Sequence, residues 1–105
     1  MKKETEDLTR EYAELLRKKL GGRIRQIVLF GSRARGRAGR DSDYDVLVVV
    51  DRRTKEAREA VLDVDVEMMN RHNALFAPLL YGEQEWRKMQ DFPLAWNIGR
   101  EGIQL

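Results

Sequence analysis

The chain has no cysteine and only one histidine, His72, among its 105 residues. The absence of cysteine excludes a disulfide framework and a thiolate zinc site, and a single histidine excludes a histidine-based metal cluster. No apolar run approaches the length of a membrane span, and residues 1–4 lack a hydrophobic signal region. We therefore expect a cytoplasmic protein that has no contact with a membrane.

An excess of charge of one sign is also lacking. The 20 basic and 18 acidic residues leave a net charge of +2, which does not by itself indicate a nucleic-acid partner. Hydrophobic residues make up 42% of the chain and charged residues 36%, and this balance is typical of a folded globular domain. At this length we expect one domain, residues 1–105, with a single modest core.

The most informative stretch runs from Gly31 to Asp45. A run of β-forming residues, 24–30, precedes it and an apolar run, 46–50, follows it, so the pattern predicts strand, glycine-hinged loop and strand. Because side chains alternate along a strand, Asp43 and Asp45 are expected to point the same way. Two close carboxylates without a local lysine are unfavourable unless a cation lies between them. A divalent ion that prefers oxygen ligands suits this position.

The loop opens with Gly31 and Ser32, and Arg33 and Arg35 follow. Glycine lets the backbone come close to a ligand, and Ser32 offers a hydroxyl and an amide to a phosphate. A solvated loop explains the arginines as well as a phosphate contact does. Alone, the Gly-Ser pair would indicate a tight turn and the two aspartates a solvated strand entry. Their combination between two strands favours a functional site.

The remaining sequence predicts helices alternating with strands. Residues 4–20 have the apolar spacing of an amphipathic helix, with Thr5 as a candidate N-cap. The apolar end of the strand at 43–50 does not alternate, which indicates burial on both faces. Pro78 indicates that its strand is an edge strand or contains a bulge. The further elements expected are a strand at 23–30, helical turns at 33–37, a strand at 74–81 and helices at 83–90 and 94–101. Together they predict an α/β (α+β) domain with three or four strands flanked by helices.

One segment, residues 54–72, has two interpretations. Thr54 is a suitable N-cap for a helix through the whole segment. The residues from Leu62 to Met68 also alternate between apolar and acidic side chains, which is typical of a strand. We favour the helix because the pattern is longer than a typical strand and is rich in alanine and methionine.

The stretch from Gly31 to Asp45 has a further property. Gly31-Ser32 and Ser42-Asp43-Tyr44-Asp45 stand with ten residues between Ser32 and Asp43. This arrangement, over residues 28–50, resembles the minimal nucleotidyltransferase (MNT) domains of the polymerase-β-like superfamily. The stretch at 85–102 is similar to the tail of small bacterial and archaeal members. The resemblance implies a polymerase-β-like nucleotidyltransferase fold with a small mixed sheet.

The resemblance implies transfer of a nucleoside monophosphate, AMP from ATP, to a hydroxyl group. Gly31 and Ser32 would then contact the triphosphate, and Asp43 and Asp45 would hold Mg²⁺ or Mn²⁺. Arg33 or Arg35 would neutralise the departing pyrophosphate.

Active members of this superfamily usually carry a third carboxylate on the next strand of the sheet. The predicted strand at 74–81 contains no acidic residue. If the strand were instead at 62–68, Asp65 would be the first candidate for this catalytic carboxylate and Asp63 the second. The favoured helix at 54–72 therefore argues against a complete catalytic set, and Asp65 is the residue on which this question depends.

The resemblance also implies a partner. Stand-alone domains of this family often act as the antitoxin of a pair whose toxin is a small α-helical HEPN-type ribonuclease, and some adenylylate that partner. The alternative is a catalytically incomplete binding module that regulates its partner by forming a complex. A homo-oligomer remains open, and nucleic-acid binding is not expected because the sequence shows no aromatic stacking platform.

Overall fold

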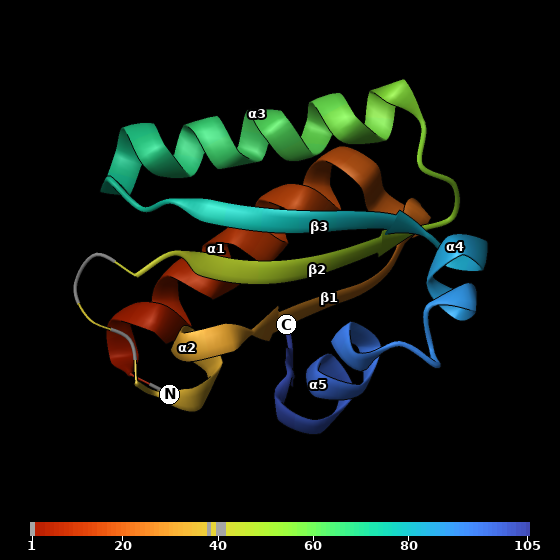
Figure 1. Cartoon of the computed structure of the whole chain (residues 1–105). Helices are drawn as coiled ribbons and strands as arrows, with labels where there is room; N and C mark the ends of the chain where they lie inside the picture. Colours follow the sequence, from red (N-terminus) through yellow and green to blue (C-terminus); the bar gives the residue numbers. More distant parts are fainter. Residues whose placement is uncertain (1, 38, 40–41) are drawn as a thin grey trace.

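The computed structural model describes residues 2–37, 39 and 42–105, and it contains a four-stranded mixed sheet in the order β3-β2-β1-β4 (Figure 1). β1 (Ile24–Phe30) pairs antiparallel with β2 (Tyr44–Val50) and with β4 (Ile103–Gln104). β3 (Phe76–Gly82) pairs parallel with β2. The expected class, a small mixed sheet with flanking helices, is confirmed.

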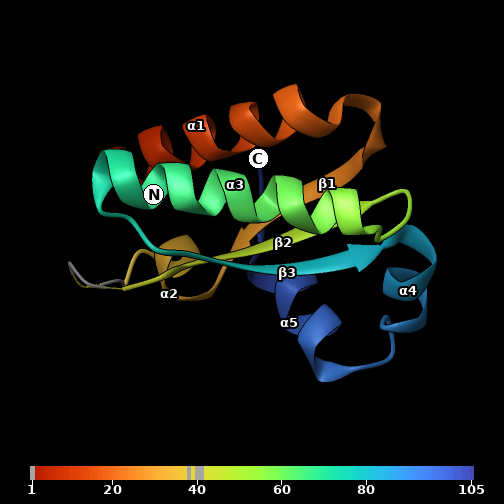
Figure 2. The same ribbon diagram turned by 90° about the horizontal axis from the view of Figure 1, so that it is seen from above.

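Helices cover both faces of the sheet (Figure 2). α1 (Lys3–Leu20) and α3 (Lys55–His72) lie side by side on one face, which we call the paired-helix face. α4 (Glu83–Lys88) and α5 (Pro93–Glu101) lie on the other, which we call the open face. α2 (Gly31–Arg35) follows β1 directly, and a short 3₁₀ turn (Gly21–Arg23) joins α1 to β1. Among the described residues, no helix is long and apolar enough to cross a membrane.

The central strand β2 divides the core into two parts. Val46, Val48 and Val50 belong to the cluster that α1 and α3 cover, whereas Leu47 and Val49 pack with the helices of the open face. Because side chains alternate along a strand, this division also fixes where the two ends of β2 point. The predicted burial of this strand on both faces is confirmed.

The ambiguous segment is a single helix, α3. The Thr54 hydroxyl caps it by accepting a hydrogen bond from the Ala57 amide at 3.1 Å. Val61, Val64 and Met68 are buried at helical spacing, so the strand alternative at 62–68 is wrong. The edge position predicted from Pro78 is confirmed, because β3 is the outermost strand of the sheet on its side.

Other boundaries differ from the expectation. α1 begins at Lys3 with Lys2 in the N-cap position, so Thr5 is not the cap, and its side chain is buried inside the first turn. β2 begins at Tyr44, so Asp43 lies just ahead of the strand. β4 was not predicted, because a strand of two residues leaves no periodicity to detect. The helix expected at 83–90 ends at Lys88, and α2 begins at Gly31.

Candidate functional site

The candidate site lies where β1 ends and β2 begins. Asp45 is the second residue of β2 and is the register partner of Phe30, the last residue of β1. By alternation, the Asp45 side chain shares the open face with Leu47, opposite to the side chain of Tyr44. The loop between the two strands therefore brings the aspartates back to the residues that follow β1.

Gly31 lies directly against Asp45. Its φ angle is +75°, a conformation that side-chain-bearing residues rarely adopt. A Cβ atom added at this position would lie 3.1 Å from Asp45 Cγ and would overlap Asp45 Oδ2. The sequence predicted that this glycine lets the backbone come close to a ligand, and the structure shows a close contact with the Asp45 carboxylate. Ser32, partly exposed, is the next residue of α2.

The electrostatics of the site favour a cation. Partial burial raises the pKa of the Asp45 carboxyl, the negative charge of Asp43 raises it further, and Arg35 partly offsets the rise. The Asp43 carboxylate therefore lies near enough for its charge to act on Asp45. A divalent cation between them would remove the repulsion that raises this pKa.

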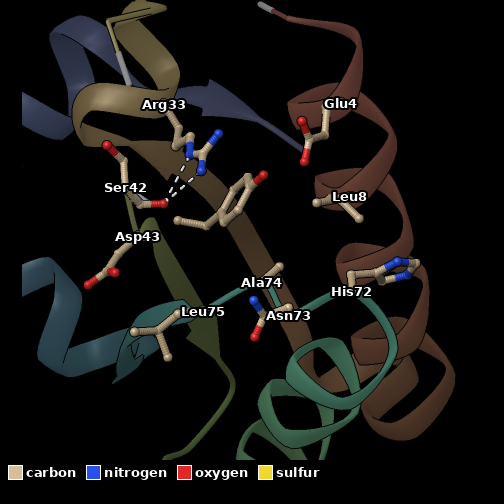
Figure 3. Close-up of a pocket in the computed structure, with 10 residues that line it drawn as sticks. Glu4, Leu8, Arg33, Ser42, Asp43, His72, Asn73, Ala74 and Leu75 are labelled. Atoms are coloured by element: carbon tan, nitrogen blue, oxygen red, sulfur yellow. Dashed lines mark hydrogen bonds between the residues drawn. The ribbon is translucent and has the colours of Figure 1, made fainter. Parts of the chain in front are cut away.

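The two arginines of α2 have different surroundings. The Arg35 Nη1 atom lies 2.9 Å from Glu101 Oε1 on α5, and the Arg35 charge also acts on Asp45. Arg33 is buried, with 8% of its surface exposed, and it donates hydrogen bonds to the carbonyl oxygen of Ser42 (Figure 3). The structure therefore places Arg35, rather than Arg33, on the same side of the sheet as Asp45.

Two aspartates are enough to bind a metal ion whose remaining ligands come from a bound nucleotide. Within the described part of the chain, no group of three or more His, Cys, Asp or Glu residues has the geometry of a metal site. Magnesium commonly binds through one or two carboxylates together with the phosphate oxygens of a substrate. Asp43 and Asp45 therefore match the donor set expected for a metal–nucleotide complex.

Asp65 is not brought together with this pair. It lies on α3, over the paired-helix face, and its Oδ1 atom accepts a hydrogen bond of 2.8 Å from the Tyr12 hydroxyl. Burial raises the pKa of Asp65 to about 6. The strand next to β2 is β3, and Ala77 is the register partner of Asp45 there. Neither residue gives the pair a third carboxylate on the open face.

A pocket of about 290 Å³ adjoins the site on the paired-helix side (Figure 3). Sequence reasoning missed it, because its walls come from segments far apart in the chain. Tyr44 was also missed as a structural element, although an aromatic residue between two aspartates is a signal that could have been followed. The pocket is lined by Arg33 and residues 42–44, by Glu4 and Leu8 of α1, and by residues 72–75.

Comparison with known proteins gives consistent matches. The model of the family described as "Nucleotidyltransferase domain" matches residues 9–91. The "Putative protein adenylyltransferase MJ0604" of Methanocaldococcus jannaschii is 29% identical over 97 residues, which cover 92% of this chain and 93% of that protein.

Two solved structures have a similar fold. One is a toxin–antitoxin complex with AMP-PNP, with a TM-score of 0.59 at 20% identity, covering 90% of this chain and 69% of the matched chain. The other contains the tri-AMPylated HEPN toxin of Shewanella oneidensis with its MNT antitoxin. Its TM-score is 0.59 at 18% identity, covering 95% of this chain and 70% of the matched chain. At these identities the likeness concerns the fold.

Proposed function

This chain belongs to the family of nucleotidyltransferase domains, and we propose that it transfers AMP from a metal-bound ATP to a hydroxyl group of a partner protein. The partner proposed is a small α-helical HEPN-type protein, for which this chain acts as the cytoplasmic antitoxin. The observation that carries the proposal is the carboxylate of Asp45, which lies against the backbone of Gly31 and is under the influence of the negative charge of Asp43.

Each residue of the candidate site would have a separate role in this reaction. Asp43 and Asp45 would hold Mg²⁺ or Mn²⁺, which when bound neutralises phosphate charge and orients the reacting oxygens. Gly31 accommodates the Asp45 carboxylate against its backbone, and Ser32 would offer its hydroxyl to a phosphate oxygen. Arg35, which is exposed and paired with Glu101, would neutralise the pyrophosphate.

The reaction itself balances without a further co-reactant. The acceptor oxygen forms a bond to the α-phosphorus, and the bond between this phosphorus and the β-phosphate bridging oxygen breaks. Pyrophosphate leaves, and the acceptor proton passes to water. Water takes this proton because Ala77, the residue next to Asp45 on the neighbouring strand, has no group that could accept it.

The same alanine favours a second candidate function. A site that lacks the third carboxylate can still bind a metal–nucleotide complex while it transfers AMP slowly or not at all. The protein would then regulate its partner by binding alone. Asp65 does not restore the set of three carboxylates, because it lies on the opposite face of the sheet, where its carboxylate accepts a hydrogen bond from Tyr12.

Two exposed aromatic side chains support a protein partner in both cases. Phe92 is 54% exposed and Trp96 is 71% exposed. They lie one helical turn apart, since the Trp96 amide donates to the Phe92 carbonyl at the start of α5. Exposed aromatic residues that are close together are typical of protein interfaces.

A transfer assay separates the two functions. Purified protein is incubated with Mg²⁺ and ATP labelled on the α-phosphate, with and without the HEPN-type protein of the neighbouring gene. The double variant Asp43→Asn/Asp45→Asn is the control for the site. Label on the partner that this variant fails to produce would establish transfer. Stable complex formation without label would establish the binding module. The absence of both label and a complex would refute both functions.

A further inference from the structure

We propose that Arg33 is a positioning residue. It fixes the segment bearing Asp43 and Asp45 through hydrogen bonds to Ser42 and a cation–π contact with Tyr44. This inference rests on the proposed function, because it assigns Arg33 a role in building the metal–nucleotide site. It also replaces the direct phosphate contact that the sequence suggested for this arginine.

Arg33 contacts the residues on both sides of Asp43 in the chain. The Nε and Nη2 atoms lie 3.2 Å and 2.8 Å from the Ser42 carbonyl oxygen. The guanidinium carbon lies 4.1 Å from the centroid of the Tyr44 ring, over its face. Figure 3 shows the hydrogen bonds from Arg33 to Ser42, which precedes Asp43. Tyr44 follows Asp43, so one buried cation contacts both neighbours of this aspartate. A planar guanidinium can form such a fork and a stacked contact together, and an ammonium group cannot.

The other face of the Tyr44 ring is also packed. Its ring stacks on Phe76 of β3, with centroids 4.6 Å apart and planes 14° apart. Phe76 in turn stacks on Tyr12 of α1 at 4.1 Å and 3°. Arg33, Tyr44, Phe76 and Tyr12 thus form a continuous column, which we call the aromatic stack, and Tyr12 ends it with its hydrogen bond to Asp65.

The carboxylate pair needs such support because its members repel each other. Asp43 and Asp45 carry like charges and are separated by one residue, so an unsupported segment would favour moving the two groups apart. Magnesium demands near-ideal octahedral geometry and tolerates little displacement of its ligands. The aromatic stack fixes the backbone on one side of β2, and Gly31 lies against Asp45 on the other.

The test uses Mn²⁺-dependent binding of AMP-PNP to the intact protein, measured by calorimetry for folded variants. We expect Arg33→Ala to weaken binding by about 10- to 100-fold, the usual effect of losing a residue that supports metal ligands. Arg33→Lys should recover only part of the loss. Arg37→Ala is the matched control, because Arg37 is exposed in the same loop, and it should bind as the wild type does.

A double-mutant cycle with Tyr44→Leu distinguishes positioning from phosphate contact. If Arg33 acts through Tyr44, the double variant should bind about as weakly as either single variant. If the two losses multiply, Arg33 contacts the ligand directly and the positioning role is overturned. Normal binding by a folded Arg33→Ala variant would overturn it as well.

Hydrogen exchange supplies a measurement that does not depend on nucleotide. The Tyr44 amide donates to the Leu75 carbonyl at 2.9 Å, and this bond reports whether the segment is held. We expect faster exchange at Tyr44 in Arg33→Ala and Arg33→Lys but not in Arg37→Ala. Unchanged exchange in Arg33→Ala would contradict the grip on Tyr44. A wild type that binds no AMP-PNP, together with faster exchange in Arg33→Ala, would refute the proposed function alone.

Discussion

The two faces of the sheet use the same kinds of residue differently. On the paired-helix face, the aromatic rings are buried in the stack and Asp65 has the Tyr12 hydroxyl as its partner. On the open face, Trp96 is exposed, and the negative charge of Asp43, a second carboxylate, acts on Asp45. A satisfied, packed face contributes stability, whereas an exposed ring and an acid beside a like charge indicate ligands that the chain itself does not supply.

The largest contrast should appear when the same substitution is made on both faces. Phe76→Ala removes the middle of the aromatic stack, and we expect it to lower the free energy of unfolding by about 3–5 kcal/mol. Phe92→Ala removes an exposed ring of the same size and should change it by less than about 0.5 kcal/mol. Urea denaturation of the two variants measures both values. Equal losses would show that the faces do not differ in this way.

Nucleotide binding should depend on the acids of one face only. We expect Asp43→Asn/Asp45→Asn to weaken Mg²⁺-dependent ATP binding by about 100-fold or more, while the fold is kept or slightly stabilised through lost repulsion. Asp65→Asn, the matched change on the other face, should leave the affinity unaltered. Calorimetric titration gives the dissociation constants. Normal ATP affinity in the double variant would remove the site from the open face.

A third comparison concerns two tryptophans. Trp86 is buried and Trp96 is exposed. We expect Trp96→Ala to leave the unfolding free energy nearly unchanged but to weaken binding of the proposed HEPN-type partner by about 10-fold. Trp86→Ala should instead destabilise the protein. Co-purification and thermal denaturation measure the two effects, and an undiminished affinity in Trp96→Ala would exclude this surface from the interface.

The smallest effect is a dependence of stability on pH. The pKa of Asp65 in the folded protein is about 6, above its ordinary value of 3.8, because of burial. The folded state therefore binds this proton more tightly than the unfolded state does. The resulting stabilisation is fully present below pH 3.8 and is lost as the pH rises through 6.

Asp65→Asn should remove this dependence. We expect the variant to be about 1 kcal/mol more stable than the wild type at pH 8, since solvent reaches part of the carboxylate and reduces the gain. At pH 4 the two proteins should differ little. Urea denaturation at both pH values provides the comparison, and a variant that is less stable at pH 8 would show that the charged hydrogen bond to Tyr12 outweighs burial.

Much of the fold could be predicted because its signals are local. The 54–72 helix is indicated by Thr54 and by apolar spacing, and both features operate within one segment. The placement of the Asp45 side chain on the open face follows from strand alternation. The contact of Gly31 with Asp45, in contrast, depends on how β1 and β2 pair, so the sequence indicated a glycine that approaches a ligand but not its contact with Asp45.

The surroundings of Arg33 were the least predictable feature. An arginine in a loop of arginines is usually solvated, and nothing local separates Arg33 from Arg37. The difference arises because Tyr44 and Phe76 pair in parallel register, and the face of the Tyr44 ring lies against Arg33. β4 was missed for a similar reason, since its pairing with β1 comes from tertiary structure.

The alanine beside the carboxylate pair has an evolutionary consequence. Ala77 is in register with Asp45 and shares the open face with it, so a side chain at 77 would point toward the site. In the genetic code, every alanine codon becomes an aspartate or glutamate codon through a single base change. If transfer by the proposed site needs a third carboxylate, one base change at codon 77 would therefore supply it without rebuilding the scaffold.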